Sequence, residues 1–182
     1  MNKERLHILT EGAIALLRDL IAIPSLSREE AGTAQCIAGF LEARGVAVQR
    51  SGHNVLARNK HYREGLPTWL LNSHHDTVKP NPGYTLDPFT PTERDGKLYG
   101  LGSNDAGGPL VSLIAAFLYF YEAEALPFNL VLAATAEEEI SGAGGIESVL
   151  SFLGPIDGAL VGEPTQMQLA IAERGLLVID AV

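Results

Sequence analysis

The sequence has very little cysteine: Cys36 is the only one among 182 residues, so no disulfide bond can form within the chain. A lone cysteine fits a protein from a reducing compartment. Cys36 stands beside the apolar residue Ile37 in an expected helix. We therefore interpret its role as packing rather than chemistry.

Basic residues are also scarce, with 13 Lys and Arg against 22 Asp and Glu and a net charge of −9 at pH 7. This charge disfavours binding to nucleic acids or anionic membranes. The most apolar stretch, 109–121, is too short to span a bilayer, and the N-terminal segment 1–18 lacks a signal-peptide core. We therefore expect a cytoplasmic protein that binds neither nucleic acid nor membrane.

Capping signals predict two helices near the start of the chain. Thr10 is the expected N-cap of the first helix, which ends before Pro24. Ser27 and Glu30 form a capping box for the second helix, and Gly45 ends it. Two more helices are expected at 106–125 and 144–153.

Short apolar runs between these segments predict strands. Continuous runs at 68–71, 128–134 and 158–161 are typical of strands buried on both faces. Weaker patterns predict further strands at 46–49, 54–57, 169–172 and 176–182. Helices and buried strands alternate, which indicates an α/β fold with a largely parallel sheet covered by helices on both faces.

Chemically active side chains follow the buried strands. Because the carboxyl ends of parallel strands meet at one edge of a sheet, we expect these side chains to converge there. Carboxylates gathered in a cleft repel one another, and a divalent cation removes that penalty. Nitrogen and oxygen ligands without thiolate suit zinc, cobalt or manganese. The residues are His74 and Asp76 after the first buried strand, Glu137, Glu138 and Glu139 after the second, Glu163 after the third, and Asp105 in a glycine-rich segment before a helix.

The spacing within two of these groups suggests separate roles. In an extended segment His74 and Asp76 point the same way, so Asp76 can hold the imidazole of His74, while His75 points away. Among the three consecutive glutamates, one can bind a metal while a neighbour stays free to take a proton from water.

Each pattern also has a simpler interpretation when taken alone. A His-x-Asp pair can be a surface hydrogen bond, a run of glutamates a solvated turn, and Gly162 to Thr165 a helix cap. The glycines around Asp105 could form a phosphate loop, but an acid stands where that loop needs glycine and no Gly-Lys-Ser/Thr follows. The joint occurrence after successive strands favours a metal site. His7, His53 and His61 are interpreted as surface residues.

These motifs together resemble the zinc-dependent amidohydrolases that include acetylornithine deacetylase, succinyl-diaminopimelate desuccinylase, aminoacylases and glutamate carboxypeptidases. The resemblance covers essentially the whole chain and is greatest to acetylornithine deacetylases. It implies a three-layer zinc-exopeptidase-like domain. The motifs are Ser73-His74-His75-Asp76-Thr77-Val78, Gly100-Leu101-Gly102-Ser103-Asn104-Asp105, Thr135-Ala136-Glu137-Glu138-Glu139 and Gly162-Glu163-Pro164-Thr165.

The resemblance also implies residue roles. His74 would bind one of two zinc ions and Asp105 would bridge them, with cobalt or manganese as possible replacements. Glu139 and Glu163 would each bind one ion. Asp76 would orient His74. Glu138 would activate metal-bound water for attack on an amide carbonyl and pass the proton to the leaving amine.

Family members are longer than this chain. The resemblance implies that residues 1–182 are the N-terminal part of the catalytic domain, and that an inserted dimerisation domain and a C-terminal segment with a second metal-binding histidine are absent. We expect the chain alone to be inactive and the full-length protein to be a homodimer.

The expected reaction of the full-length protein is deacylation of a small N-acyl amino acid, N-acetylornithine or N-acetylcitrulline, in arginine biosynthesis. The alternatives are a dipeptidase, carboxypeptidase or desuccinylase of the same family, or a metal-binding module without activity.

Overall fold

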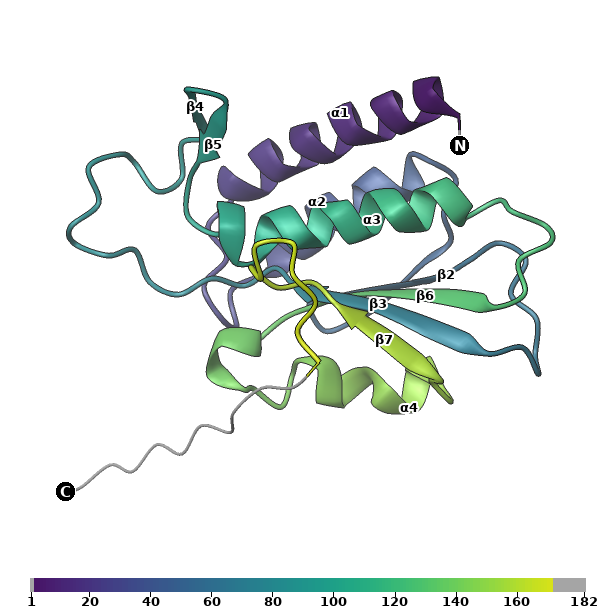
Figure 1. Ribbon diagram of the computed structural model, residues 1–182. Coiled ribbons are helices and arrows are strands. Elements are labelled where there is room, and N and C mark those ends of the chain that lie inside the picture. The colour runs from purple at the N-terminus through teal and green to yellow at the C-terminus, as the bar shows by residue number, and fades with distance from the viewer. Residues whose placement is uncertain (1, 172–182) are drawn as a thin grey trace.

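The computed structural model describes residues 2–171, in which helices cover both faces of a five-stranded sheet (Figure 1). This arrangement confirms the predicted α/β class. The helices are α1 (Lys3–Ile21), α2 (Ala31–Glu42), α3 (Gly108–Phe120) and α4 (Leu150–Leu153). The strands are β1 (Val48–Ser51), β2 (Asn54–Arg58), β3 (Thr68–His74), β4 (Thr92–Arg94), β5 (Lys97–Tyr99), β6 (Asn129–Thr135) and β7 (Gly158–Val161).

The large sheet has the strand order β1-β2-β6-β3-β7. Strands β6, β3 and β7 run parallel, whereas β1 and β2 are antiparallel to their neighbours, so the sheet is mixed. His74 pairs with Thr135 across β3 and β6, and Asn72 pairs with Val161 across β3 and β7. The register therefore brings the segments that follow these strands to one edge of the sheet.

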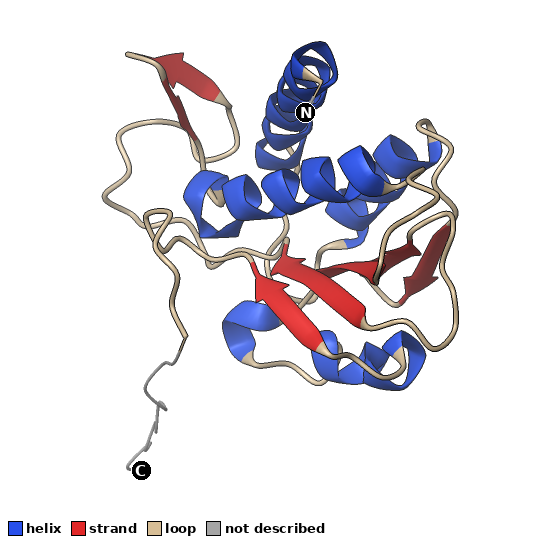
Figure 2. Cartoon of the chain, turned by 45° about the vertical axis from the view of Figure 1, so that its right-hand side comes forward, coloured by secondary structure: helices blue, strands red, loops and turns tan. Residues whose placement is uncertain are grey.

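Two apolar cores lie on opposite faces of the sheet, as the helices above and below it in Figure 2 indicate. On the fully buried strand β6, Leu130 and Leu132 pack into the core under α1, α2 and α3. Val131 and Ala133 point the other way and pack with Val149 and Leu153. The alternation follows from the period of two residues in a strand. Cys36 on α2 is partly buried against the larger core.

The first helix begins earlier than the sequence predicted. Asn2 caps α1, because its side-chain oxygen accepts the backbone N–H groups of Glu4 and Arg5 at 3.1 and 3.2 Å. Thr10 lies inside the helix, where its hydroxyl donates to the carbonyl of Leu6 at 2.9 Å. The prediction of Thr10 as the N-cap was therefore wrong. The helix begins at Lys3, and Asn2 accepts the N–H groups of its first turn.

The predicted capping box of α2 is also wrong. Glu30 precedes the helix but makes no capping bond with its side chain. The hydroxyl of Ser27 instead donates to Asp76 at 2.7 Å, and Glu30 is fully buried among other partners. Ser27 therefore bonds to a distant residue, and Glu30 accepts the N–H groups of Arg28 and Glu137 rather than that of Ser27.

Several other boundaries differ from the expectations. The helix expected at 106–125 is the shorter α3, and the one at 144–153 divides into a 3₁₀ turn (Ile146–Val149) and α4. Strand β7 is at the edge of the sheet and largely exposed, which contradicts its predicted burial. Residues 169–171 form no strand. Residue 172 and the strand expected at 176–182 lie outside the described residues.

Within residues 2–171, no helix has the length and apolar character needed to cross a membrane.

Candidate metal centre

The imidazole of His74 is the centre of a group of potential metal ligands. His74 ends β3 and is 1% exposed. Its Nε2 lies 3.2 Å from Oδ1 of Asp105. One ligand atom each from His74, Asp105 and Glu139 lie within 4.8 Å of one another. The sequence pattern predicts that these three residues lie close together, and the structure places them so.

Two more of the expected residues face the same ring nitrogen. Nε2 of His74 lies 3.7 Å from a carboxylate oxygen of Glu138 and 3.9 Å from one of Glu163. The side chains of Asp105 and Glu138 are 57% and 53% exposed, whereas that of His74 is buried. The group therefore has a buried imidazole at its base and carboxylates at an edge open to solvent.

The other side of the His74 ring is held by Asp76. Nδ1 of His74 lies 3.3 Å from Oδ1 of Asp76 and 3.1 Å from its backbone oxygen. The Asp76 carboxylate also accepts the backbone N–H groups of Glu138 and Glu139, each at 3.1 Å, and the hydroxyl of Ser27. Asp76 thus links the histidine to the turn that carries two of the other acidic residues.

These contacts change the acidity of both partners. Burial alone raises the pKa of Asp76, but the hydrogen bonds from His74, Ser27 and the two backbone N–H groups lower it below the ordinary value. Burial lowers the pKa of His74, but the bond and charge of Asp76, together with nearby glutamates, raise it to about 9.

Two other acidic side chains have raised pKa values, in contrast to Asp76. Burial and the charge of Asp105 raise the pKa of Glu139. Burial and the charges of Glu138 and Asp105 raise the pKa of Glu163. Negative charge therefore accumulates here beyond what His74 can compensate, and a divalent cation would relieve it. One imidazole nitrogen with carboxylate oxygens is a suitable donor set for zinc, cobalt or manganese.

Glycines allow the tight turn that carries Asp105. Gly102 has a φ of +72°, a conformation that favours glycine. The N–H of Gly107 donates to the carbonyl of Gly102 at 2.8 Å and closes the π-helical turn Ser103–Gly107. A side chain on Gly107 would collide with that carbonyl and with Leu17 of α1. The turn therefore needs small residues where the sequence has them.

The first of the three glutamates points away from the group. Glu137 has a φ of +54°. This left-handed conformation costs a non-glycine residue about 1–2 kcal/mol. Its carboxylate lies against Gly142 and Gly144, accepting the N–H of Gly144 at 3.4 Å, and lies 3.8 Å from Nε of Arg28. Of this run, Glu138 and Glu139 face His74 and Glu137 does not.

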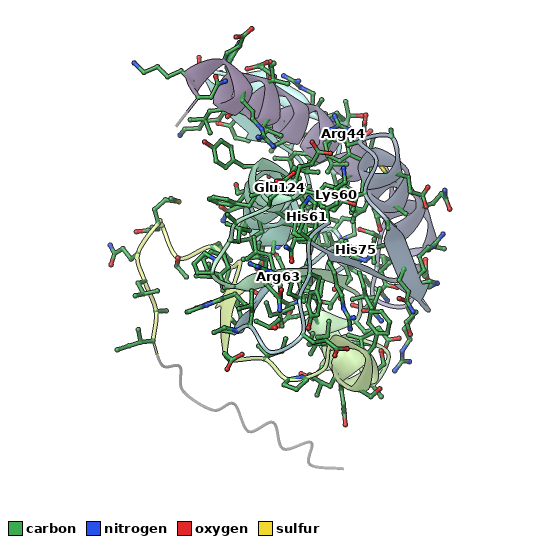
Figure 3. The ribbon with its side chains drawn as sticks, turned by 90° about the vertical axis from the view of Figure 1, so that its right-hand side faces the viewer. Arg44, Lys60, His61, Arg63, His75 and Glu124 are labelled. Carbon is green, nitrogen blue, oxygen red and sulfur yellow. The ribbon has the colours of Figure 1, made fainter. Side chains whose placement is uncertain are left out.

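His75, labelled in Figure 3, lies inside the fold and does not join the group. Its Nδ1 is 2.9 Å from the hydroxyl of Thr33, and its Nε2 is 3.2 Å from the backbone oxygen of His53. Burial lowers the pKa of His75 to about 4, so it remains neutral at physiological pH.

Sequence reasoning missed the role of two residues near the centre and misplaced a third. The sequence indicates Ser27 and Glu30 only as caps, and no local signal points to the long-range contacts that they make. His53 was interpreted as a surface residue, but its side chain is only 34% exposed and its Nδ1 lies 2.6 Å from Glu30.

Comparison with known proteins places the centre in a family context. The sequence model described as peptidase family M20/M25/M40 matches residues 70–174, more than half of the chain. The acetylornithine deacetylase of Proteus mirabilis is 38% identical over 179 residues, covering 90% of this chain and 45% of the relative. The succinyl-diaminopimelate desuccinylase of Xylella fastidiosa is 34% identical over 172 residues, covering 87% and 46%. The chain thus spans about half the length of these relatives.

Solved structures share the fold. Human carnosine dipeptidase 1 aligns with a TM-score of 0.68 at 21% identity, covering 90% of this chain and 41% of that one. A dinuclear metal-binding peptidase from Bacillus subtilis aligns with a TM-score of 0.63 at 22% identity, covering 88% and 43%. At such identities the likeness concerns the fold alone.

Proposed function

The chain belongs to peptidase family M20/M25/M40, and from that premise we propose that it carries the metal-holding part of an enzyme that hydrolyses the amide bond of an N-acyl amino acid. One observation carries the proposal. Ligand atoms of His74, Asp105 and Glu139 lie within 4.8 Å of one another, beside the partly exposed carboxylate of Glu138.

We assign four side chains to metal binding: His74, Asp105, Glu139 and Glu163. Asp105, whose Oδ1 lies 3.2 Å from Nε2 of His74, would hold metal at the open edge of the group, and the family resemblance implies that it would serve both ions. We propose zinc, with cobalt or manganese as alternatives of similar ligand preference. When bound, the metal supplies a Lewis acid that polarises the substrate carbonyl and makes water more acidic.

The remaining residues move or position protons. Glu138 takes a proton from the attacking water and delivers it to the nitrogen of the leaving amine, which completes cleavage of the C–N bond. Asp76 holds Glu138 through the backbone N–H of that residue. The half-exposed carboxylate of Glu138 is therefore available for this role. Asp76 orients the imidazole of His74 through Nδ1 and leaves Nε2 facing the carboxylates.

The proposed substrates are N-acetylornithine and N-acetylcitrulline, hydrolysed in arginine biosynthesis in the cytoplasm. Support comes from relatives called acetylornithine deacetylase at 37–39% identity. An N-succinyl amino acid is the second candidate, favoured by the desuccinylase relative at 34% identity. We propose that residues 1–182 are the N-terminal part of the catalytic domain and that the full-length protein is a homodimer. The chain covers 45% of the length of the acetylornithine deacetylase relative.

The test is a substrate panel on the zinc-loaded full-length protein, because residues 1–182 alone are expected to be inactive. Acetylornithine, acetylcitrulline, a succinylated diamino acid and a dipeptide are compared by release of free amine. We expect Glu138→Gln to reduce kcat by about 10²–10⁴-fold, because general-base catalysis typically contributes that factor. Glu147→Gln, at a nearby exposed glutamate, is the matched control.

Two results would contradict the proposal. If Glu138→Gln hydrolyses substrate as fast as the parent, Glu138 is not the base. If the full-length protein binds metal but cleaves no amide in the panel, the site is a metal-binding module without the proposed activity.

A further inference from the structure

A fully buried carboxylate lies behind the metal centre. Glu30 is 0% exposed, and each of its oxygens has a partner. Oε1 accepts the backbone N–H of Arg28 at 2.7 Å and that of Glu137 at 3.1 Å. Oε2 lies 2.6 Å from Nδ1 of His53. A buried ionisable group persists only where such partners replace water. The partners here come from three separate parts of the chain.

The bond to Glu137 connects Glu30 to the metal-facing glutamates. Asp76 accepts the N–H groups of Glu138 and Glu139, and Glu30 accepts that of Glu137. Two buried carboxylates thus hold three consecutive backbone N–H groups of the turn that presents Glu138 and Glu139 to His74. Without Glu30 the first of these N–H groups would lose its acceptor at a partly buried position.

The backbone of Glu137 needs this support. Its φ of +54° is a conformation that non-glycine residues seldom adopt, and it sets the direction in which the next two residues leave β6. Its own side chain faces Gly142 and Gly144 rather than the ligands. The hydrogen bond from Glu137 N–H to Glu30 therefore stabilises the turn at a residue with an unfavourable backbone conformation.

His53 joins the same network from the turn between β1 and β2. Its ring contacts Glu30, and its backbone oxygen lies 3.2 Å from Nε2 of His75. Nδ1 of His75 meets the hydroxyl of Thr33 on α2. His53 thereby links the Glu30 side chain to the buried His75 and, through it, to α2.

We propose that Glu30, held by His53, is a positioning residue for the metal centre: it fixes the backbone of Glu137 so that Glu138 and Glu139 face His74. This inference rests on the proposed metal site. It assigns to Glu30 no contact with metal or substrate. The effect of its loss is a displaced glutamate turn in an otherwise folded chain.

A pair of variants of nearly equal size tests this role. Glu30→Met removes both acceptor oxygens, whereas Glu30→Gln retains one oxygen for the N–H groups of Arg28 and Glu137. Co²⁺ is titrated into each chain, and its visible absorption reports both affinity and coordination geometry. Thermal unfolding in EDTA shows separately that each variant is folded. Glu29→Ala, at the neighbouring exposed glutamate, is the control.

We expect Glu30→Met to bind Co²⁺ about 10–100-fold more weakly with an altered spectrum, the usual range for residues that support metal ligands. Glu30→Gln and Glu29→Ala should resemble the parent. A folded Glu30→Met with the parent's affinity and spectrum would overturn the proposal, as would a Glu30→Gln as weak as Glu30→Met.

If Glu30→Met does not fold, Co²⁺ binding by Glu30→Asp tests the proposal instead. This variant keeps the charge but is one methylene too short to reach its partners, so we expect weakened Co²⁺ binding; parent-like binding overturns the proposal. Failure of the parent chain itself to bind Co²⁺ would instead contradict the proposed metal site, so the two failures are distinguishable.

Discussion

The two ring nitrogens of His74 have different surroundings, and the difference assigns their roles. Nδ1 faces Asp76, a buried acceptor whose pKa is lowered by its other hydrogen bonds. Nε2 faces three carboxylates that compete for one imidazole. Because Asp76 fixes the ring from one side, the open nitrogen is available to a cation that the carboxylates would share.

Asp105→Asn should weaken metal binding at this centre. Loss of a residue that only supports a ligand typically reduces affinity about 10–100-fold, so loss of a direct ligand should reduce it at least about 100-fold. Titration calorimetry with Zn²⁺ measures the change, and Asp19→Asn on the exposed face of α1 is the matched control. An Asp105→Asn chain that retains the parent's metal content and affinity would show that Asp105 is not a ligand.

The sequence predicted the residues of the centre more completely than it predicted their supports. His74, Glu139 and Glu163 follow strand-like segments directly, so the general geometry of parallel sheets was enough to bring them together. Ser27 and Glu30 act on partners 49 and 107 positions away. Nothing local distinguishes these long-range contacts, in which Ser27 donates and Glu30 accepts, from helix caps, because the same side-chain oxygens serve both purposes.

Strand β6 lies at the centre of the large sheet and is buried on both faces. It is bonded to antiparallel β2 on one side and parallel β3 on the other, and all seven of its residues are buried. Its apolar run predicted this correctly. The equally apolar run of β7 predicted burial wrongly, because burial depends on a strand's place in the sheet, and β7 lies at an edge.

Leu132→Ala in β6 should destabilise the chain by about 2–5 kcal/mol, because it leaves a cavity in a core where Leu132 is 0% exposed. Leu150→Ala makes the same chemical change at a residue that is 55% exposed and should alter stability by less than about 0.5 kcal/mol. Urea unfolding followed by circular dichroism measures both. Equal losses for the two variants would contradict the burial pattern of the sheet.

For the molecule as a whole, a bound metal couples the centre to the stability of the fold. The ligands come from the ends of β3, β6 and β7 and from the turn before α3, so they meet only in the folded chain. A ligand that binds only the folded state stabilises it by mass action.

Chelation should therefore lower the unfolding temperature. Free Zn²⁺ at 100 times its Kd adds about 2.7 kcal/mol to the free energy of unfolding, which corresponds to about 5–10 °C in a domain of this size. Calorimetry of the parent in Zn²⁺ and in EDTA measures the shift, and Asp105→Asn should show a smaller one. An identical unfolding temperature with and without Zn²⁺ would contradict metal binding to the folded state.

The half-exposed carboxylates at the open edge of the centre should also affect the rate at which divalent cations bind. Asp105 and Glu138 project charge into solvent from a chain whose net charge is −9, so cations are drawn toward the opening before any contact forms. That attraction extends over about 10 Å at 0.1 M salt and shortens as salt increases. Added salt should therefore slow the association of divalent ions, as stopped-flow mixing can follow, while their dissociation from the buried imidazole changes much less.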